Sequence, residues 1–262
     1  MTSRYAAMFE RCTAAGEGAF GAFLMLGDPD LETSAELLDA LVEGGADMVE
    51  LGIPFSDPVA DGPVIQAAAL RALGAGVRTR HCLDLISAFR GRHSDVPIGI
   101  LTYANIVAAR GIEAFCAELA AAGVDSLLVA DVPSIEAGPY AAAARAAGID
   151  LVMIAAPNTP RATLARVAEL SSGYTYCVAR AGVTGADAEL ALDHAPLFAA
   201  LREVGAPAPV LGFGISSPGH VRQALASGAA GVISGSAIVA KVEQGPASVR
   251  DFVASMKSAT RR

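Results

Sequence analysis

Short runs of apolar, often β-branched residues alternate along this chain with longer segments in which apolar residues recur every three or four positions. The first pattern is typical of buried strands and the second of amphipathic helices. Several helical segments end in glycine directly before the next apolar run, which is a common way for a helix to end. Eight strands are predicted in this way, at residues 19–26, 47–52, 98–103, 126–131, 150–155, 174–180, 208–213 and 231–235.

Eight strand–helix units in a chain of this length predict an α/β protein, a single (β/α)8 TIM barrel over residues 1–262. The strands are apolar on both faces, as a parallel sheet covered by helices requires. A doubly wound open sheet is the alternative, but such folds usually carry G-x-G-x-x-G after the first strand, where this chain has LGDPD. An extra N-terminal helix is predicted by the spacing of Tyr5, Met8, Phe9 and Cys12.

Composition and charge narrow the class of protein. The 262 residues are 53% hydrophobic and 18% charged, enough to bury a large core. The net charge of −8 disfavours nucleic-acid binding, which needs clustered positive charge. The uncharged stretches 204–221 and 223–240 are interrupted by Gly, Pro and Ser, so no membrane span is expected. Four scattered cysteines and no signal-peptide pattern predict free thiols and a cytoplasmic location.

Acidic residues dominate the predicted C-terminal ends of the strands, where barrels of this kind place their active sites. Both lysines, Lys241 and Lys257, lie near the C-terminus, so a Schiff-base aldolase is not expected. The four histidines fall in helices or connecting loops and predict no metal site. General acid–base chemistry by carboxylates remains. The ionisable residues at these strand ends are Asp28, Glu50, Asp57, Asp61, Asp131 and Arg180.

Two of these carboxylates are the main catalytic candidates: Glu50 lies within the predicted strand 47–52, and Asp61 lies on the loop that follows it. Glu50 stands in the apolar segment MVELGIPF, where burial would raise its pKa toward neutral pH. A buried glutamate can equally belong to a structural ion pair. Asp61 lies in the Pro- and Gly-rich loop PFSDPVADGP, where an acid often serves only to cap a turn. Their occurrence together above one strand favours the catalytic interpretation.

Glycine-containing turns follow the last three predicted strands: RAGVTGA at 180–186, GFGISSPG at 212–219 and ISGSAIV at 233–239. Glycine lets backbone N–H groups approach an anion, and the start of a helix adds the positive end of its dipole. Loops after strands 7 and 8 commonly hold phosphate in these barrels, although a single glycine turn can serve only the bend. Aromatic residues near the strand ends suit a flat aromatic substrate, or simply fill the core: Phe23, Tyr103, Tyr176 and Phe213.

Long blocks of this sequence resemble the tryptophan synthase alpha subunit family over nearly the whole chain. They include ELGIPFSDPVADGPVIQAA at 50–68, GVDSLLVADVP at 123–133 and GAAGVISGSAIV at 228–239. The resemblance implies a TIM-barrel lyase of tryptophan biosynthesis that cleaves indole-3-glycerol phosphate into indole and glyceraldehyde 3-phosphate. Met25 departs from the family, which often has Thr there, and this could reshape the pocket near Glu50.

The resemblance also implies roles for individual residues. Glu50 matches the general acid–base and Asp61 the carboxylate that accepts the indole N–H. Thr184 matches the residue that pairs with Asp57 when the loop after strand 6 closes. Phosphate contacts carry over to the backbones of Gly185, Gly214, Gly235 and Ser236, and the pocket for indole and the glyceryl chain to Phe23, Leu101, Tyr103, Leu128, Ala130, Ile154, Tyr176 and Phe213.

A partner is implied in the same way. In the family, indole passes to a beta subunit that carries pyridoxal phosphate, within an alpha2beta2 heterotetramer, whereas the alpha chain itself uses no cofactor or metal. Asn105, Pro133 and the loop around Pro58 match the face that meets this partner. Two alternatives stay open, a stand-alone lyase that releases free indole and a catalytically silent barrel that only activates its partner.

Overall fold

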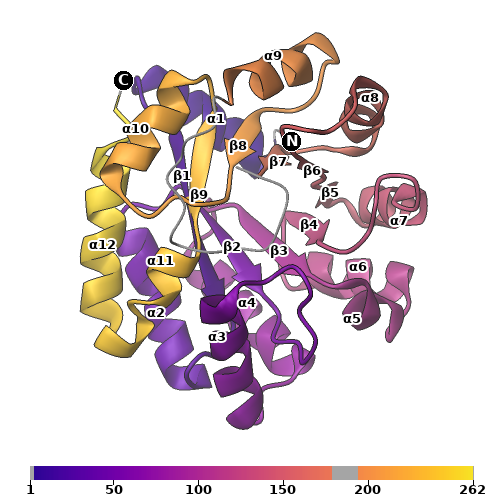
Figure 1. Cartoon of the computed structure of the whole chain (residues 1–262). Coiled ribbons are helices and arrows are strands. Elements are labelled where there is room, and N and C mark those ends of the chain that lie inside the picture. The colour runs from indigo at the N-terminus through magenta and orange to yellow at the C-terminus, as the bar shows by residue number, and fades with distance from the viewer. Residues whose placement is uncertain (1–2, 179–193, 262) are drawn as a thin grey trace.

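The central feature of the computed structural model is one sheet of parallel strands, described together with its helices over residues 3–178 and 194–261. Neighbouring strands follow the order β5-β4-β3-β2-β1-β9-β8-β7-β6, and helices surround them (Figure 1). The strands are β1 (Ala19–Met25), β2 (Met48–Gly52), β3 (Ile98–Thr102), β4 (Ser126–Val129), β5 (Asp150–Leu151), β6 (Ile154–Ala155), β7 (Thr175–Cys177), β8 (Pro209–Leu211) and β9 (Gly231–Ser234).

Helices follow most of the strands, so each parallel pair is connected by a crossover. An additional helix precedes β1, as the spacing of apolar residues in the first segment predicts. The helices are α1 (Arg4–Ala14), α2 (Leu31–Glu43), α3 (Pro63–Gly74), α4 (Thr79–Arg92), α5 (Ala104–Ala108), α6 (Ile112–Ala121), α7 (Gly138–Ala147), α8 (Arg161–Leu170), α9 (Ala195–Glu203), α10 (Pro218–Ala226), α11 (Ser236–Val239) and α12 (Pro246–Ser258), with a 3₁₀ turn at Val242–Gln244.

The fifth predicted strand, 150–155, is divided into β5 and β6, which raises the strand number from eight to nine. β5 pairs with β4, whereas β6 pairs with β7. Val152 continues the first ladder by donating to Leu127 O at 2.9 Å, and Met153 O accepts from Tyr176 N at 3.0 Å in the second. The two ends of the strand order are thus joined by consecutive residues, and the sheet closes into the predicted barrel.

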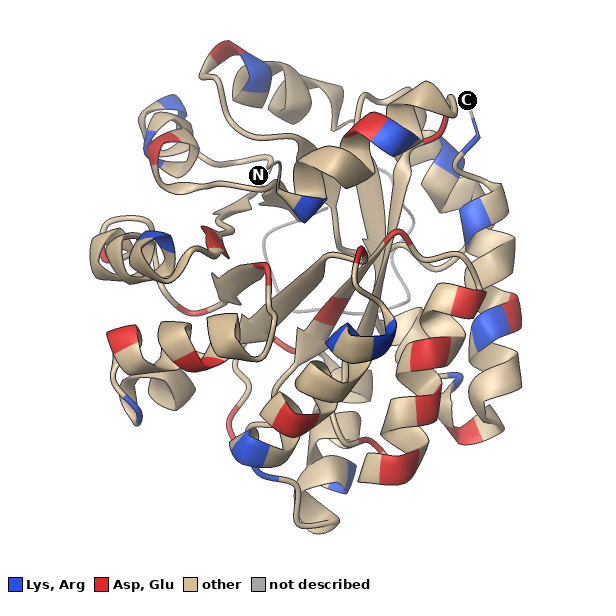
Figure 2. Ribbon diagram, turned by 180° about the vertical axis from the view of Figure 1, so that it is seen from behind, with Lys and Arg blue, Asp and Glu red and all other residues tan. Residues whose placement is uncertain are grey.

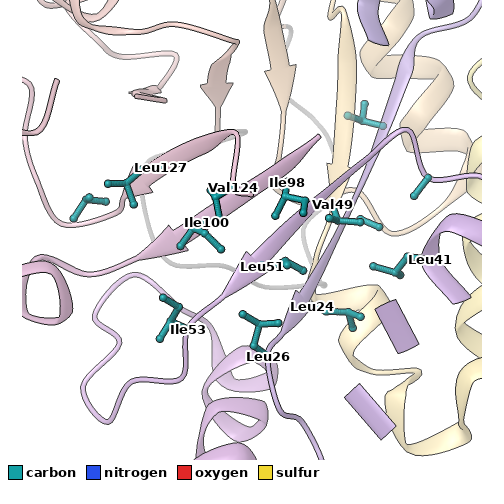
Figure 3. Close-up of a cluster of buried hydrophobic side chains, with 14 of the residues drawn as sticks. Leu24, Leu26, Leu41, Val49, Leu51, Ile53, Ile98, Ile100, Val124 and Leu127 are labelled. Atoms are coloured by element: carbon teal, nitrogen blue, oxygen red, sulfur yellow. The ribbon is translucent and has the colours of Figure 1, made fainter. Parts of the chain in front are cut away.

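Successive side chains along a strand point to opposite faces of the sheet, so the buried apolar residues form two clusters. In β2, Val49 and Leu51 join the large cluster between the strands and the surrounding helices (Figure 3). Met48 belongs instead to the smaller cluster inside the barrel, and Glu50, two residues later, has the same direction. Burial is nearly complete in both clusters. The strand alternation therefore turns Glu50 toward the interior.

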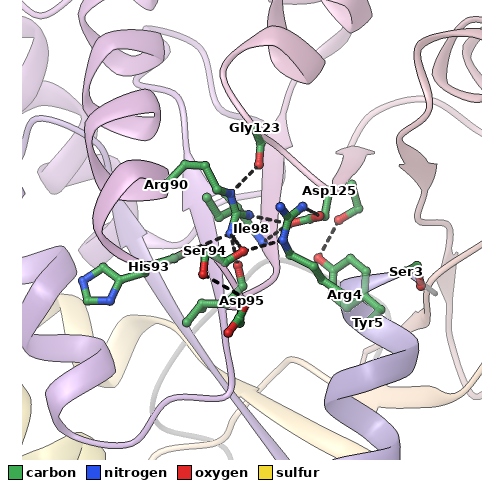
Figure 4. A network of polar contacts seen from close by, with 12 residues as sticks. Ser3, Arg4, Tyr5, Arg90, His93, Ser94, Asp95, Ile98, Gly123 and Asp125 are labelled. Carbon is green, nitrogen blue, oxygen red and sulfur yellow. Dashed lines mark hydrogen bonds and ion pairs between the residues drawn. The ribbon is translucent and has the colours of Figure 1, made fainter. Parts of the chain in front are cut away.

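The N-terminal ends of the strands are held together by a network of ion pairs, which we call the floor (Figure 4). Asp125 accepts from Arg90 at 2.6 Å, from Arg4 of α1 at 2.8 Å and from the Ile98 amide at 2.8 Å. Arg90 also donates to four carbonyl oxygens, those of Gly123, His93, Ser94 and Val96. Beside it, the Tyr5 hydroxyl lies 2.8 Å from Ser126 Oγ. These contacts hold helix α1 against the N-terminal ends of the strands.

Charged residues lie mainly on the outer helices and loops, and the sheet carries few of them (Figure 2). All four cysteines are buried free thiols, which confirms that prediction. Among residues 3–178 and 194–261, none of the helices is long and apolar enough to cross a membrane. A charged side chain inside the barrel is therefore an exception, and such a residue is a candidate for function.

Candidate active site

One cavity lies inside the barrel toward the C-terminal ends of its strands, with about 750 Å³ of space including its open mouth. Most of the residues predicted for the site line it. They are Phe23, Glu50, Asp61, Leu101, Leu128, Ala130, Ile154, Tyr176, Phe213, Gly214, Gly235 and Ser236.

Glu50 lies in the middle of β2 and is only 3% exposed. Its register partners are Phe23 on β1 and Gly99 on β3. The Tyr174 hydroxyl donates to Glu50 Oε1 at 3.1 Å. Burial raises the pKa of Glu50 to about 8, with a further rise from the nearby charge of Asp61, while the Tyr174 hydrogen bond acts in the opposite direction. Glu50 is therefore able to give and take a proton near neutral pH.

Asp61 reaches the same cavity from the loop between β2 and α3, and it is 7% exposed. Burial raises its pKa, and a hydrogen bond from Tyr103 opposes this rise by favouring the carboxylate. Tyr103 is itself buried, with its ring stacked on Phe55 at 5.4 Å, and its hydroxyl also accepts from the Ala60 amide at 3.3 Å. Asp61 is thus held in place by a buried tyrosine.

Neither carboxylate belongs to an ion pair within the described part of the chain. The alternative of a structural ion pair for Glu50 is therefore not supported there. Asp28, at the end of β1, shows what such a pair looks like, because Arg71 binds both of its carboxylate oxygens, at 2.7 and 2.9 Å. A buried carboxylate without a cation is a costly arrangement that commonly marks a functional site.

Two glycine-containing loops, after β8 and β9, form another part of the cavity wall. The loop after β8 contains Gly214 at φ +77°, a left-handed conformation that favours glycine. The loop after β9 brings Gly235 and Ser236 to the lining, at the start of the single-turn helix α11. The first amides of a helical turn have no acceptor within it. Backbone donors are thus available in this part of the cavity without a basic side chain.

Two of the predicted residues that the structure describes do not line the cavity. Tyr103 contacts Asp61, as given above, and Asp57 is exposed on the loop after β2. Thr184 and Gly185, together with Arg180, lie outside the described residues. Met25 is buried near Gly52 and Phe23 and is not part of the cavity wall.

Sequence reasoning also missed several residues of the site. The most important is Tyr174, whose two-residue spacing from Tyr176 on one predicted strand was a usable signal, because such residues share a face. The others are small or apolar residues of loops and strands, which carry no chemical signal by themselves. The missed lining residues are Ala60, Ile65, Gly212, Ile215, Ser216, Ile233 and Ala237.

The histidines occupy α4, its C-cap, the N-cap of α9 and α10, in agreement with the expectation of helices and loops. Over the described ranges, no group of three or more His, Cys, Asp or Glu could hold a metal ion. The chemistry that the described cavity itself can supply is therefore proton transfer by two carboxylates, in a pocket with apolar walls.

Comparisons with known proteins agree with this arrangement. The family model described as tryptophan synthase alpha chain matches residues 9–261. Tryptophan synthase alpha chains from Aeromonas hydrophila and Shewanella amazonensis are 52% and 50% identical to this chain, covering 99% and 98% of it and 100% of each relative.

Solved structures give the same result. A structure of Mycobacterium tuberculosis tryptophan synthase superposes with a TM-score of 0.91 at 33% identity, over 100% of both chains. The tryptophan synthase complex from Pyrococcus furiosus superposes with a TM-score of 0.81 at 36% identity, over 92% of this chain and 98% of that one. Both the sequence match and the fold extend across the cavity described above. This chain belongs to the tryptophan synthase alpha chain family.

Proposed function

We propose that this chain is a lyase that cleaves indole-3-glycerol phosphate into indole and glyceraldehyde 3-phosphate, as the alpha subunit of tryptophan synthase. One observation carries the proposal. Glu50 and Asp61 share an apolar cavity with two glycine-containing loops and have no basic partner in the described structure. This combination suits an aromatic substrate with a phosphate group.

Glu50 acts as both acid and base in this reaction. Its protonated form, which a pKa of about 8 favours at neutral pH, gives a proton to C3 of the indole ring. The resulting carboxylate then takes the proton of the glyceryl hydroxyl next to the bond that breaks. The electrons of the broken carbon–carbon bond neutralise the protonated ring, which leaves as indole, while the hydroxyl carbon becomes the aldehyde. Glu50 ends the cycle protonated again.

Asp61 stabilises the cation that exists between these two steps. Protonation at C3 makes the ring an indolenine cation, whose N–H is a stronger donor than that of indole. A carboxylate that accepts this N–H lowers the energy of the cation more than that of the substrate, which is what catalysis requires. The hydrogen bond from Tyr103 favours the carboxylate form of Asp61 and opposes the larger effect of burial, which raises its pKa.

The remaining lining residues bind the two ends of the substrate. Leu101, Leu128 and Ile154 offer apolar surface to the indole ring. Backbone groups of Gly214, Gly235 and Ser236 bind the phosphate. Closure of the loop after β7, with Thr184 near Asp57 and Gly185 on the phosphate, stays a prediction, because that loop lies outside the described residues.

The loops after β2, β3 and β4 suit a partner surface, since they emerge from the same end of three neighbouring strands. Val59 is 71% exposed on the loop after β2, and Ile135 is 73% exposed on the loop after β4. Asn105 in α5 and Pro133 on the loop after β4 are also exposed. We assign this face to a beta subunit that carries pyridoxal phosphate in an alpha2beta2 complex. The chain is then one cytoplasmic domain that itself needs no cofactor.

An assay of indole release from indole-3-glycerol phosphate tests the proposal, with the chain alone and with a beta subunit added. We expect slow release by the chain alone and clear stimulation by the partner. Full turnover without stimulation would instead identify a stand-alone lyase. If the chain released no indole but still stimulated the beta subunit, the silent-barrel alternative would replace the lyase proposal.

A further inference from the structure

The loop between β8 and α10 forms much of the part of the cavity assigned to the phosphate and is held by three side chains. Tyr176, which itself lines the cavity, donates its hydroxyl to Gly212 O at 3.2 Å. The buried Ser234 hydroxyl donates to Ile215 O at 2.7 Å. The third contact comes from His220, in the first turn of α10. The first two contacts fix carbonyl groups, whereas His220 contacts the amide and the hydroxyl of a lining residue.

That residue is Ser216. Its backbone N–H donates to Nδ1 of His220 at 3.3 Å, and its hydroxyl oxygen lies 3.3 Å from the same nitrogen. A ring nitrogen that accepts an N–H carries no proton and has a single lone pair in the ring plane. The two Ser216 groups therefore compete for Nδ1. While the amide donates to Nδ1, the proton of the Ser216 hydroxyl can turn toward another acceptor, such as a ligand in the cavity that the residue lines.

The charge of the cavity makes such a donor useful. The cavity lining contains Glu50 and Asp61 but no Lys, Arg or His among the described residues. A phosphate group entering this site must be bound by neutral N–H and O–H donors, and hydrogen bonds to a charged group are stronger than neutral ones. Ser216 lines the same cavity as Gly214, Gly235 and Ser236.

We propose that His220 is a positioning residue that holds the Ser216 amide, so that the Ser216 hydroxyl binds the phosphate of the substrate. The inference rests on the proposed function, because it assigns that part of the cavity to a phosphate monoester. The His220 side chain is not needed to cap α10. Ser217 already caps it by accepting from the His220 amide at 3.3 Å.

Binding of two unreactive ligands tests this pair in the full chain, namely indole-3-propanol phosphate and the alcohol indole-3-propanol. Ser216→Ala should weaken binding of the phosphate about tenfold and His220→Ala roughly three- to tenfold, the size of one hydrogen bond to a charged group. Binding of the alcohol should stay within about twofold of the parent, since it lacks the phosphate.

A conservative variant separates positioning from folding. His220→Asn places an amide oxygen where Nδ1 stands, so it should restore phosphate binding close to that of the parent. The double variant Ser216→Ala/His220→Ala should lose no more than Ser216→Ala alone, because His220 acts through Ser216. In cleavage of indole-3-glycerol phosphate, KM should rise in His220→Ala while kcat changes little.

Three results would overturn the inference: unchanged phosphate binding in both single variants, equal loss for the two ligands, or additive losses in the double variant. The proposed function fails in a different way. If the parent chain bound the phosphate no better than the alcohol, or released no indole from indole-3-glycerol phosphate, the phosphate assignment itself would be wrong. Parental cleavage with unaffected variants would reject only the roles of Ser216 and His220.

Discussion

The two ends of this barrel treat buried charge in opposite ways. On the floor, the carboxylate of Asp125 is matched by two guanidinium groups and a backbone amide, and Arg90 satisfies its donors on five different residues. In the cavity, Glu50 and Asp61 are more deeply buried than Asp125, but in the described structure they are met by tyrosine hydroxyls instead of cations.

The paired and the unpaired carboxylates also differ in how readily they change protonation state. A fully paired charge holds its protonation state and connects elements that are far apart in sequence, here α1, α4 and the strands β3 and β4. An unpaired buried carboxylate has a raised pKa and can change its protonation state near neutral pH. The floor therefore stabilises the fold, and the cavity carries out the chemistry. Substitutions in each region should affect one of these properties without the other.

The largest effect on stability is expected for Asp125→Ala. It leaves Arg90 and the Ile98 amide buried without their acceptor, which should lower the free energy of unfolding by about 3–5 kcal/mol. Urea unfolding measures this loss. Asp39→Ala is the matched control, because it breaks more exposed contacts, with Arg92 and His93, and should cost no more than about 2 kcal/mol. The fraction of Asp125→Ala that stays folded should still cleave substrate, and a loss of kcat there would contradict the separation.

Glu50 should make stability depend on pH. Its pKa is raised from 4.5 in the unfolded chain to about 8, so between these values the folded state keeps a proton that the unfolded chain has released. The free energy of unfolding therefore falls as pH rises through this window. Glu50→Gln does not titrate, so its stability relative to the parent should grow by on the order of 4 kcal/mol from pH 5 to pH 8. Denaturant unfolding of both proteins at several pH values checks this, and a constant difference would refute it.

Asp61→Asn tests the second carboxylate. The amide oxygen can still accept the indole N–H, but the negative charge that stabilises the cation is lost. We expect kcat to fall roughly 10- to 100-fold, equivalent to about 1.5–3 kcal/mol for a charged hydrogen bond. KM should change much less. Steady-state kinetics give both values, and a change in KM alone would make Asp61 only a binding residue.

The smallest effect is expected for Tyr174→Phe. Removing the hydroxyl takes away a hydrogen bond that favours the Glu50 carboxylate, so the pKa of Glu50 should rise further. Because the protonated form starts the reaction, the alkaline decline of kcat/KM should move up by about one pH unit. The groups facing Glu50 also include Asp61, Tyr5 and Tyr176, which the variant leaves in place.

Tyr5→Phe provides the matched control for this pH profile. It removes a hydroxyl whose partner is Ser126 and leaves the hydrogen bond between Tyr174 and Glu50 intact. Its profile should therefore stay close to that of the parent. If the two variants moved the profile equally, the specific effect of the Tyr174 hydrogen bond would be refuted.

Much of the fold could be predicted because it depends on side-chain periodicity. Short apolar runs such as 47–52 identified the strands. The direction of Glu50 could not be predicted, because these strands are apolar on both faces, and only the structure places its side chain inside the barrel. The division of 150–155 into two strands could not be predicted. It arises where Val152 and Met153 bond to strands on opposite sides, and this depends on the stagger of the closed barrel rather than on residue type.

The site was predictable to the extent that its residues carry charge or aromatic rings. Glu50 and Asp61 stand out as acids in apolar or Pro-rich surroundings, and the cavity contains both. The contacts that tune them could not be predicted: Tyr103 was expected to line the pocket and not to bind Asp61, and nothing in the sequence pairs Tyr174 with Glu50. Ser216 and His220 are separated by four positions in a loop and a helix, and only the turn between them brings the two together.

The central claim is that Glu50 carries the proton in cleavage, and Glu50→Gln tests it most directly. The amide keeps the shape of the side chain but cannot transfer a proton. Indole release should fall by about 10²- to 10⁴-fold, while an unreactive indole-alkyl phosphate binds within a few-fold of the parent. Turnover within a few-fold of the parent, measured in the same assay with the same beta subunit, would show that another group moves the proton and would contradict the account.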